Sequence, residues 1–376
     1  MKKVIILGGG IAGLSTAISL RDMGVSVQLF EKATEIKPVG AGIMLASNVH
    51  RILAEWGLLE LLNERGHKLE RFVISSNKGR TLATLNLKQD TKQTVAIHRA
   101  DLHEILLKQL RDIPIYYGKK AVQYFQDEHG IKVVFNDGEA VTGDLLIAAD
   151  GIHSVIRKQL LPNKSIRYAG YTCWRGVTNT KEQIKLADEL HEIWGANGRF
   201  GYVPISNEKV YWYMLMKRQL SDVIISTYTV SNLKEYMEGY PQPVLDLLKN
   251  TPNEQIINHD IYDLPPINQY AFGKVALVGD AAHAMTPNLG QGACQGIEDA
   301  YVLGQCLHNN IETGLKEYEN RRVARASKIS KLSYKIGSIA QFDNPFLCTI
   351  RNGLMMSTPQ FLSQKQNEFI YDYQHN

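Results

Sequence analysis

The first residues of the chain show a strand–helix–strand pattern of apolar positions. Residues 4–7 form a short apolar run with β-branched side chains, which is typical of a buried strand. Apolar side chains then recur at helical spacing over residues 11–20, and Gly24 is placed to end that helix. A second apolar run over residues 25–30 predicts the next strand. This order is typical of an α/β fold with a parallel sheet.

A different pattern, in which apolar and polar side chains alternate, recurs in the middle of the chain. Such runs occur at residues 72–74, 210–216 and 224–230. Alternation predicts an antiparallel sheet with one buried face. In the second run the period of two places Tyr211 with Tyr213 on one face and Trp212 with Met214 on the other. The sequence does not determine which of the two faces meets a ligand.

The turn after the first predicted strand is rich in glycine. Its sequence, GGGIAG, contains the pattern G-x-G-x-x-G at Gly8, Gly10 and Gly13. The first glycine permits a tight turn, the second lets the backbone approach a pyrophosphate, and the third lets helix and strand pack closely. The amides at the start of the helix then face the anion, so the loop predicts a dinucleotide site.

A carboxylate follows at the end of the second predicted strand. Glu31 lies 18 residues after Gly13, about where an acid accepts the ribose hydroxyls of a dinucleotide. A carboxylate at this place disfavours a 2′-phosphate, so the site suits FAD or NAD better than NADP. We also expect Ile11, Ala12 and Lys32 to line the dinucleotide.

Composition and charge exclude several classes of function. A net charge of +4 on 376 residues is too small to indicate nucleic-acid binding. The four cysteines show neither a C-x-x-C pair nor metal-ligand spacing, which favours packing in a reducing cytoplasm. No apolar stretch reaches the roughly 18 residues of a membrane span, and the early first strand leaves no room for a signal peptide. We therefore expect a cytoplasmic protein of about two interleaved domains, without a metal site.

Two further motifs follow predicted buried strands. DGIHSVIR at residues 150–157 follows the apolar run 145–149, and GDAAHAMTPNLGQG at 279–292 follows 274–278. The last motif ends in a glycine-rich turn that opens a helix, where free N–H groups and the positive end of the dipole can face an anion. The sequence contains no second G-x-G-x-x-G loop after a strand, so a nicotinamide cofactor would have no Rossmann site of its own.

With these three motifs in this order, the chain resembles the single-component FAD-dependent aromatic hydroxylases of the p-hydroxybenzoate hydroxylase fold, and among them salicylate hydroxylase and FAD-dependent urate hydroxylase. The resemblance covers nearly the whole chain. It implies an α/β fold in which a Rossmann-like, glutathione-reductase-type FAD-binding domain is interleaved with an antiparallel-sheet substrate domain, followed by C-terminal helices. The implied ranges are 1–68, 98–164 and 269–330 for the FAD-binding domain, 69–97 and 165–268 for the substrate domain, and 331–376 for a helical tail.

The resemblance also implies the cofactors and their contacts. FAD is the bound cofactor, and NADH or NADPH is a transient electron donor. Asp150 and Arg157 match positions that serve FAD and NAD(P)H together, and Asp280 matches the residue that binds the FAD ribitol. His283 is interpreted as structural. The implied contacts around the flavin ring are Gly42 in the segment 38–43, Arg99 before a helix, Pro287 near the reactive edge, and the helix-opening turn Gly290, Gln291 and Gly292.

Two residues of the predicted sheet match a substrate site. In the urate hydroxylase branch of the family an arginine and a tyrosine bind and deprotonate the substrate, and Arg199 and Tyr211 look like the matching positions. The alternative is that both serve sheet packing and surface charge. The segment 174–176, Trp-Arg-Gly, resembles a part of the pocket wall and leaves the same alternatives open.

The reaction that the resemblance implies is monooxygenation of a small aromatic or heteroaromatic ring. NAD(P)H reduces FAD, O₂ adds at C4a, and the hydroperoxide delivers one oxygen to the ring, with Arg199, Tyr211 and Pro287 at the reacting centre. One alternative is a monooxygenase of the same fold for a larger polycyclic or isoprenoid substrate, as in tetracycline-inactivating enzymes and epoxidases. A second alternative is a flavin-binding protein without turnover. The protein is expected to be a monomer or homodimer without nucleic-acid or membrane partners.

The C-terminal part of the chain predicts helices. Basic side chains over residues 321–335 are expected to form the solvated face of a helix. Apolar side chains after residue 345 are expected to dock against the core or a dimer partner, at Phe346, Leu347, Ile350, Leu354 and Phe361.

Overall fold

The chain forms two compact units in the computed structural model. The described residues are 2–35, 41–87, 93–179, 186–220, 222–358 and 368–371. Unit 1 contains residues 1–38, 102–167 and 262–334, and unit 2 contains residues 39–101, 168–261 and 335–376. Each unit is therefore assembled from three separated segments. The assignment of segments to cofactor and substrate binding stays a prediction.

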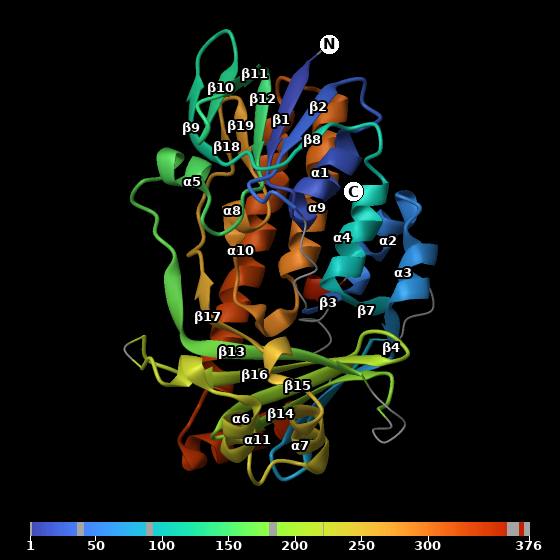
Figure 1. Cartoon of the computed structure of the whole chain (residues 1–376), viewed down its shortest axis with the longest axis vertical. Helices are drawn as coiled ribbons and strands as arrows, with labels where there is room; N and C mark the ends of the chain where they lie inside the picture. Colours follow the sequence, from blue (N-terminus) through green and yellow to red (C-terminus); the bar gives the residue numbers. More distant parts are fainter. Residues whose placement is uncertain are drawn as a thin grey trace. The chain divides into compact units, whose positions relative to one another are not determined.

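Unit 1 is built on a six-stranded sheet with the strand order β18-β19-β12-β1-β2-β8 (Figure 1). Its strands are β1 (Lys3–Leu7), β2 (Ser26–Phe30), β8 (Ile115–Tyr116), β12 (Leu145–Ala148), β18 (Ala271–Phe272) and β19 (Val275–Leu277). Neighbouring strands pair in parallel, except that β18 is antiparallel to β19. The side chains of β12 and β19 are buried, as the apolar runs predict, and the α/β fold class is confirmed.

Helices and a small meander complete unit 1. The helices are α1 (Ile11–Leu20), α5 (Val155–Leu160), α8 (Asp280–His283) and α9 (Gly292–Asn309), with the 3₁₀ turn η3 (Pro287–Leu289) between the last two. The helices α4 (Arg99–Lys108) and α10 (Gly314–Ala340) contribute residues to both units. The meander strands are β9 (Ala121–Gln126), β10 (Ile131–Phe135) and β11 (Ala140–Gly143). Helix α1 ends before Gly24, whose φ of +66° supplies the left-handed turn.

Unit 2 is built on a seven-stranded sheet with the order β17-β13-β16-β15-β14-β5-β6. Its strands are β5 (Arg71–Ser76), β6 (Thr81–Asn86), β13 (Arg167–Asn179), β14 (Glu189–Gly195), β15 (Gly198–Pro204), β16 (Lys209–Lys217) and β17 (Ile257–Asp263). The central strands β13, β16, β15 and β14 pair antiparallel, as the alternating run 210–216 predicts. The prediction is wrong in part for the run 72–74, because β5 pairs antiparallel with β6 but in parallel with β14. A three-stranded sheet adds β3 (Gly42–Leu45), β7 (Thr94–His98) and β4 (His67–Leu69). The helices are α2 (Ser47–Glu55), α3 (Leu59–Arg65), α6 (Val230–Tyr236), α7 (Gln242–Lys249) and α11 (Pro345–Ser357).

The strand predicted over residues 224–230 is wrong. This segment forms a 3₁₀ turn, η1 (Ile225–Thr227), and then enters α6. The hydroxyls of Ser226 and Thr227 donate to nearby backbone carbonyls at 2.6 and 2.8 Å. The next helix starts with a capping box formed by Thr229 and Asn232. Such local bonds compete with a strand ladder, and here they outweigh the β-branched composition.

The C-terminal segment also differs from expectation. Helix α10 runs without interruption across residue 331, where a separate tail was predicted. Within α11, Phe346 and Leu354 remain 71% and 66% exposed. The helix buries Arg351 instead, whose Nη1 donates to the Ala340 carbonyl at 3.1 Å. Docking against the core is therefore wrong for Phe346, Leu347, Ile350 and Leu354, while docking against a dimer partner stays a prediction. Phe361 lies outside the described residues.

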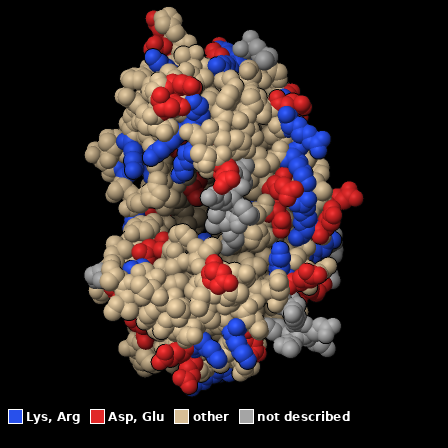
Figure 2. All heavy atoms as spheres, viewed as in Figure 1, with Lys and Arg blue, Asp and Glu red and all other residues tan. Residues whose placement is uncertain are grey.

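The distribution of charged side chains and of cysteines is as expected from the small net charge and the absence of cysteine motifs. Acidic and basic side chains are interspersed on the face drawn in Figure 2. All four cysteines are buried. Within the described residues, no helix has the length and hydropathy needed to cross a bilayer, and no cluster of three or more acidic, histidine or cysteine side chains has the arrangement of a metal site.

Candidate functional site

The carboxyl ends of four adjacent strands of unit 1 carry the predicted dinucleotide motifs. In the strand order β19-β12-β1-β2, these ends lead to Asp280, Asp150, Gly8 and Glu31. The first and second motifs touch, because a Cβ on Gly8 would lie 2.3 Å from the Ala149 carbonyl oxygen. Ligands of open α/β sheets bind outside this edge. The fold therefore gathers residues that are far apart in the sequence at one edge of the sheet.

The glycine-rich loop has the geometry that a diphosphate requires. Gly8 has a φ of +102°, which side chains rarely adopt. A Cβ on Gly13 would lie 1.9 Å from the Gly8 carbonyl oxygen, so only glycine allows α1 to start this close to β1. A Cβ on Gly10 would meet nothing within 4 Å, which leaves open space beside the first turn of α1. That turn carries no acidic side chain, so its free amides and dipole favour an anion.

Glu31 lies against this loop. Its Oε2 accepts a hydrogen bond from the Gly9 amide at 2.6 Å, and its Oε1 accepts one from the Ala33 amide at 2.8 Å. On the other side, the His103 Nε2 lies 2.6 Å from the Gly9 carbonyl. The carboxylate predicted to meet the ribose is thus fixed beside the loop predicted to meet the phosphates. Lys32 is exposed next to it.

The second motif contains a carboxylate with one unpaired oxygen. Asp150 Oδ2 accepts a hydrogen bond from the Val155 amide at 2.9 Å, but its buried Oδ1 has no partner among the described residues. Burial raises the pKa of this carboxyl, and its hydrogen bonds offset only part of that effect. A buried acceptor without a donor is typical of a site where a ligand donates the hydrogen bond, from a hydroxyl or an amide.

Arg157 joins the second motif to the third. Its side chain is 1% exposed, so it does not present its charge to a ligand directly. Its Nη1 donates to the Ala281 carbonyl at 3.1 Å and to the Asp280 carbonyl at 3.5 Å, while Nη2 donates to the Ile152 carbonyl. Ser154 caps α5 by accepting from the Arg157 amide. The arginine therefore orients the backbone that carries Asp280.

The third motif places two helix starts at the same edge. Asp280 is exposed at the first position of α8, and Pro287 is exposed at the start of η3. Gly290 has a φ of +62°, and a Cβ on Gly292, at the start of α9, would meet nothing within 4 Å. Gln291 differs from the others, since its side chain is buried and accepts from Gln295 Nε2 at 3.1 Å. Its side chain is therefore not exposed to a ligand.

A buried network of charges, which was not predicted from the sequence, supports this motif. The Arg322 guanidinium lies 2.6 Å from Asp299 and 2.5 Å from Glu298, all fully buried. Asp299 also accepts from the Gly279 amide at 2.8 Å and lies 2.5 Å from His283. Burial by itself would raise the pKa of Asp299, but the charges of His283 and Arg322 lower it to about 2. Asp299 thereby holds the residue directly before Asp280.

Two glycines of α9 bring this helix close to α1. A Cβ on Gly296 would lie 3.1 Å from the Ala12 Cβ, and a Cβ on Gly304 would lie 2.7 Å from the Ser19 Cβ. These contacts advance in the same direction along both helices, so the helices run parallel and start at the same end. Two positive dipole ends therefore meet at the strand edge that carries the motifs. The spacing of these two glycines is a sequence signal from which the close packing of α9 against α1 could have been predicted.

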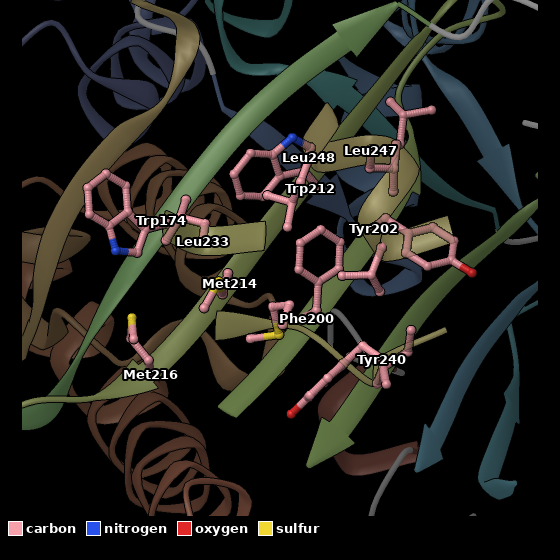
Figure 3. Close-up of a cluster of buried hydrophobic side chains, with 14 residues drawn as sticks. Trp174, Phe200, Tyr202, Trp212, Met214, Met216, Leu233, Tyr240, Leu247 and Leu248 are labelled. Atoms are coloured by element: carbon pink, nitrogen blue, oxygen red, sulfur yellow. The ribbon is translucent and has the colours of Figure 1, made fainter. Parts of the chain in front are cut away.

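The two faces of the large sheet of unit 2 pack against different elements. Trp212, Met214 and Met216 of β16 pack in a cluster with Leu233 of α6 and Leu247 of α7 (Figure 3). Those helices fill that face. Tyr211 and Tyr213, on alternate positions, therefore belong to the opposite face, which we call the tyrosine face. By strand pairing it also contains Arg175 of β13 and Arg199 of β15.

Tyr211 lies directly against β3. A Cβ on Gly42 would lie 2.4 Å from Tyr211 Cδ1, so this glycine lets the strand cross the tyrosine ring. Burial raises the pKa of Tyr211, and the nearby charge of Arg175 opposes that effect only in part. The phenol is therefore neutral at physiological pH, suited to donating a hydrogen bond and unsuited to acting as a base. Gly42 and Tyr211, predicted from separate patterns, are in contact.

Arg199, which was predicted to bind the substrate, is buried beside a carboxylate of its own sheet. It is 1% exposed, and its Nη1 lies 3.6 Å from the Glu192 carboxylate, which is 4% exposed. Glu192 also accepts from Trp194 Nε1 at 2.7 Å and from the Tyr213 hydroxyl. Tyr213 reaches this carboxylate across Gly201, where a Cβ would lie 2.2 Å from the tyrosine Cζ. The charge of Arg199 is thus balanced inside the sheet.

One further predicted contact lies elsewhere in unit 2. Arg99 is exposed at the first position of α4, and its amide donates to the Ala41 carbonyl at 2.9 Å. Residues 38–40 of the predicted flavin-side segment lie outside the described residues.

Comparison with known proteins agrees with this geometry. The family of FAD binding domains matches residues 1–333. The aurachin C monooxygenase/isomerase of Stigmatella aurantiaca is 36% identical over 358 residues, which cover 94% of this chain and 93% of that protein. The 2-heptyl-3-hydroxy-4(1H)-quinolone synthase of Pseudomonas aeruginosa is 32% identical over 375 residues, 98% of this chain and 97% of that protein. The structure of Klebsiella pneumoniae HpxO complexed with FAD and uric acid has a TM-score of 0.89, with 28% identity over 98% of this chain and 96% of that one.

Proposed function

This chain belongs to the family of FAD binding domains and is an FAD-dependent monooxygenase like its relatives; from that premise we propose that it uses NADH or NADPH and O₂ to hydroxylate a bicyclic nitrogen heteroaromatic ring. The observation that carries the proposal is the meeting of Asp280, Asp150, Gly8 and Glu31 at adjacent strand ends of unit 1. A heteroaromatic ring is favoured because the similar proteins are named for a quinolone or contain uric acid.

The residues at the strand ends of unit 1 fit FAD. The open backbone at Gly10 and the first amides of α1 hold the diphosphate, and Glu31 accepts the adenosine ribose hydroxyls. Asp280 takes the ribitol, oriented by Arg157 and Asp299. The start of α9 at Gly292 stabilises negative charge on the ring system. When bound and reduced, FAD supplies the electrons and the oxygen activation that no side chain provides.

The tyrosine face of unit 2 supplies the substrate contacts in this proposal. The opposite face is filled by α6 and α7, whereas the tyrosine face packs in part against the β3-β7-β4 sheet and also carries hydroxyl and guanidinium groups. Such a mixture suits a flat ring with a few polar edges. Tyr211 is neutral and orients the ring by donating a hydrogen bond, and exclusion of water by the apolar neighbours protects the reaction from uncoupling.

The purified protein tests this function directly. We expect it to be yellow, and we expect its oxidation of NADH or NADPH to accelerate when 2-heptyl-4(1H)-quinolone or uric acid is added. Mass spectrometry should show one added oxygen atom per product molecule, derived from ¹⁸O₂. A yellow protein that accelerates only with large isoprenoid or polycyclic compounds would contradict the proposed substrate class. A yellow protein that shows no turnover with any ring would contradict the enzymatic proposal.

A further inference from the structure

Two arginines lie on the tyrosine face of unit 2, and their surroundings differ. In the strand pairing, Arg199 stands opposite Leu215, while Arg175 stands opposite Tyr213. Arg199 is fully buried and already faces the Glu192 carboxylate. A substrate anion could reach its charge only by displacing a buried carboxylate that also accepts from Trp194 and Tyr213, which is costly.

Arg175 has no such counter-charge. Its Nε donates to the Cys173 sulfur at 3.3 Å. Among the described residues, no carboxylate lies within ion-pair distance of its guanidinium. Three other arginines in or next to the same sheet, Arg71, Arg199 and Arg218, each have such a carboxylate. The residue is only half-buried. It therefore keeps donors and a permanent positive charge available on this face.

Tyr211, which lies near Arg175, is the second hydrogen-bond donor on this face. Its charge acts on the hydroxyl of Tyr211, and the phenol of Tyr211 is neutral because burial raises its pKa. Tyr211 stands opposite Val177, two positions along β13 from Arg175, so both side chains point to the same side of the sheet. A guanidinium and a phenol on the same face of two paired strands can bind one oxygen atom with high electron density.

We infer that Arg175, together with Tyr211, binds a ring oxygen of the substrate, in the carbonyl or enolate form, and that Arg199 does not. The inference rests on the proposed function and narrows its substrate class to heteroaromatic rings that carry such an oxygen. A cation beside this oxygen favours the electron-rich, anionic form of the ring, which is the form that accepts electrophilic oxygen. Arg175 is thus a specificity-determining residue, and Arg199 belongs to the buried framework.

The test compares three variants of the FAD-loaded protein. Arg175→Gln removes the charge, and Arg71→Gln removes an exposed arginine of the same sheet that pairs with Glu189 at 3.1 Å. The double variant Glu192→Gln/Arg199→Gln removes both partners of the buried pair together. The dissociation constants of uric acid and 2-heptyl-4(1H)-quinolone are read from the change in flavin absorption, without turnover, and the KM and kcat of NADH oxidation are measured beside them.

We expect Arg175→Gln to weaken binding of both rings by about 10- to 100-fold, the effect of losing a charge-assisted hydrogen bond. Arg71→Gln should bind within about twofold of the natural protein, and the double variant should lose less than Arg175→Gln. Equal binding by Arg175→Gln and the natural protein would overturn the inference, as would a double variant that loses as much as Arg175→Gln. Failure of the natural protein to bind either ring would overturn it too. Binding that depends on Arg175 without hydroxylation would instead contradict the proposed function alone.

Discussion

The substitution Gly201→Ala tests how the tyrosine face is built. Gly201 faces the ring of Tyr213, and an added Cβ would lie 2.2 Å from the tyrosine Cζ and 2.5 Å from its hydroxyl. Contacts between carbon atoms settle at about 3.5 Å or more, so the ring must move by more than an ångström. Because the tyrosine reaches Glu192 only by crossing this glycine, the movement breaks its hydrogen bond to the carboxylate.

The expected loss can be estimated from these contacts. A hydrogen bond to a charged group contributes about 1.5–3 kcal/mol, and overpacking a core costs about 1–3 kcal/mol. Some relaxation is expected, so we predict a decrease of about 3 kcal/mol in the free energy of unfolding. That is a large part of the roughly 5–15 kcal/mol that keeps a typical protein folded. Gly201 is not in the left-handed region of φ, so the effect is steric and not conformational.

Urea unfolding followed by tryptophan fluorescence measures this loss, with Gly353→Ala as the matched control. Gly353 lies within α11, and a Cβ there would meet nothing within 4 Å. Alanine favours a helix interior by up to about 1 kcal/mol over glycine, so the control should be equal to or more stable than the natural protein. A Gly201→Ala protein within about 0.5 kcal/mol of the natural one would refute the described packing of Tyr213 on Gly201.

Three further predictions concern unit 1. Gly13→Ala should weaken FAD binding by about 100-fold or more, measured by FAD titration, because its Cβ would displace the Gly8 carbonyl and misalign at least two amide–phosphate hydrogen bonds. Asp299→Asn should destabilise the protein by about 3–5 kcal/mol at neutral pH, since it leaves Arg322 partly uncompensated. The folded pKa of Asp299, about 2, is below the ordinary 3.8, so the gap in urea stability should shrink as pH falls from about 4 to 2. Asp150→Asn should stabilise the FAD-free protein at neutral pH, because burial raises the pKa of Asp150 and disfavours its charge. That gain should vanish as pH falls through the raised pKa, and a constant gain would contradict the assignment.

The local elements of unit 1 could be predicted because their signals are short-range. The apolar run before Gly8, the glycine spacing and the position of Glu31 each constrain a few neighbouring residues, and the structure has the predicted strands and helix there. The antiparallel pairing of β16 with its neighbours follows equally from alternation. Residues 224–230 show the limit, since composition favoured a strand while Thr229 and Asn232 started a helix.

The roles of buried charges were not predictable, because they depend on which strands and helices become neighbours. Arg322 belongs to a basic stretch that was expected to be solvated throughout, yet the packing of α10 against α9 buries it between Glu298 and Asp299. The pairing of β14 with β15 places Glu192 within reach of Arg199, and neither residue carries a sequence signal for the other. The family resemblance pointed to Arg199 as a substrate-binding residue, but it did not reveal that the Glu192 carboxylate balances the charge of Arg199.

The central claim is that Asp280 and the adjacent strand ends of unit 1 hold FAD. The most direct test is titration of FAD into the FAD-free protein and two variants, Asp280→Ala and Asp112→Ala, followed by visible absorption. Asp112 is an exposed carboxylate outside the motifs. We expect the natural protein to be yellow and the Asp112→Ala variant to bind FAD equally well. The Asp280→Ala variant should bind FAD at least about tenfold more weakly, since a charge-assisted hydrogen bond is lost. A natural protein that stays colourless with added FAD, or an Asp280→Ala variant that binds like Asp112→Ala, would contradict it.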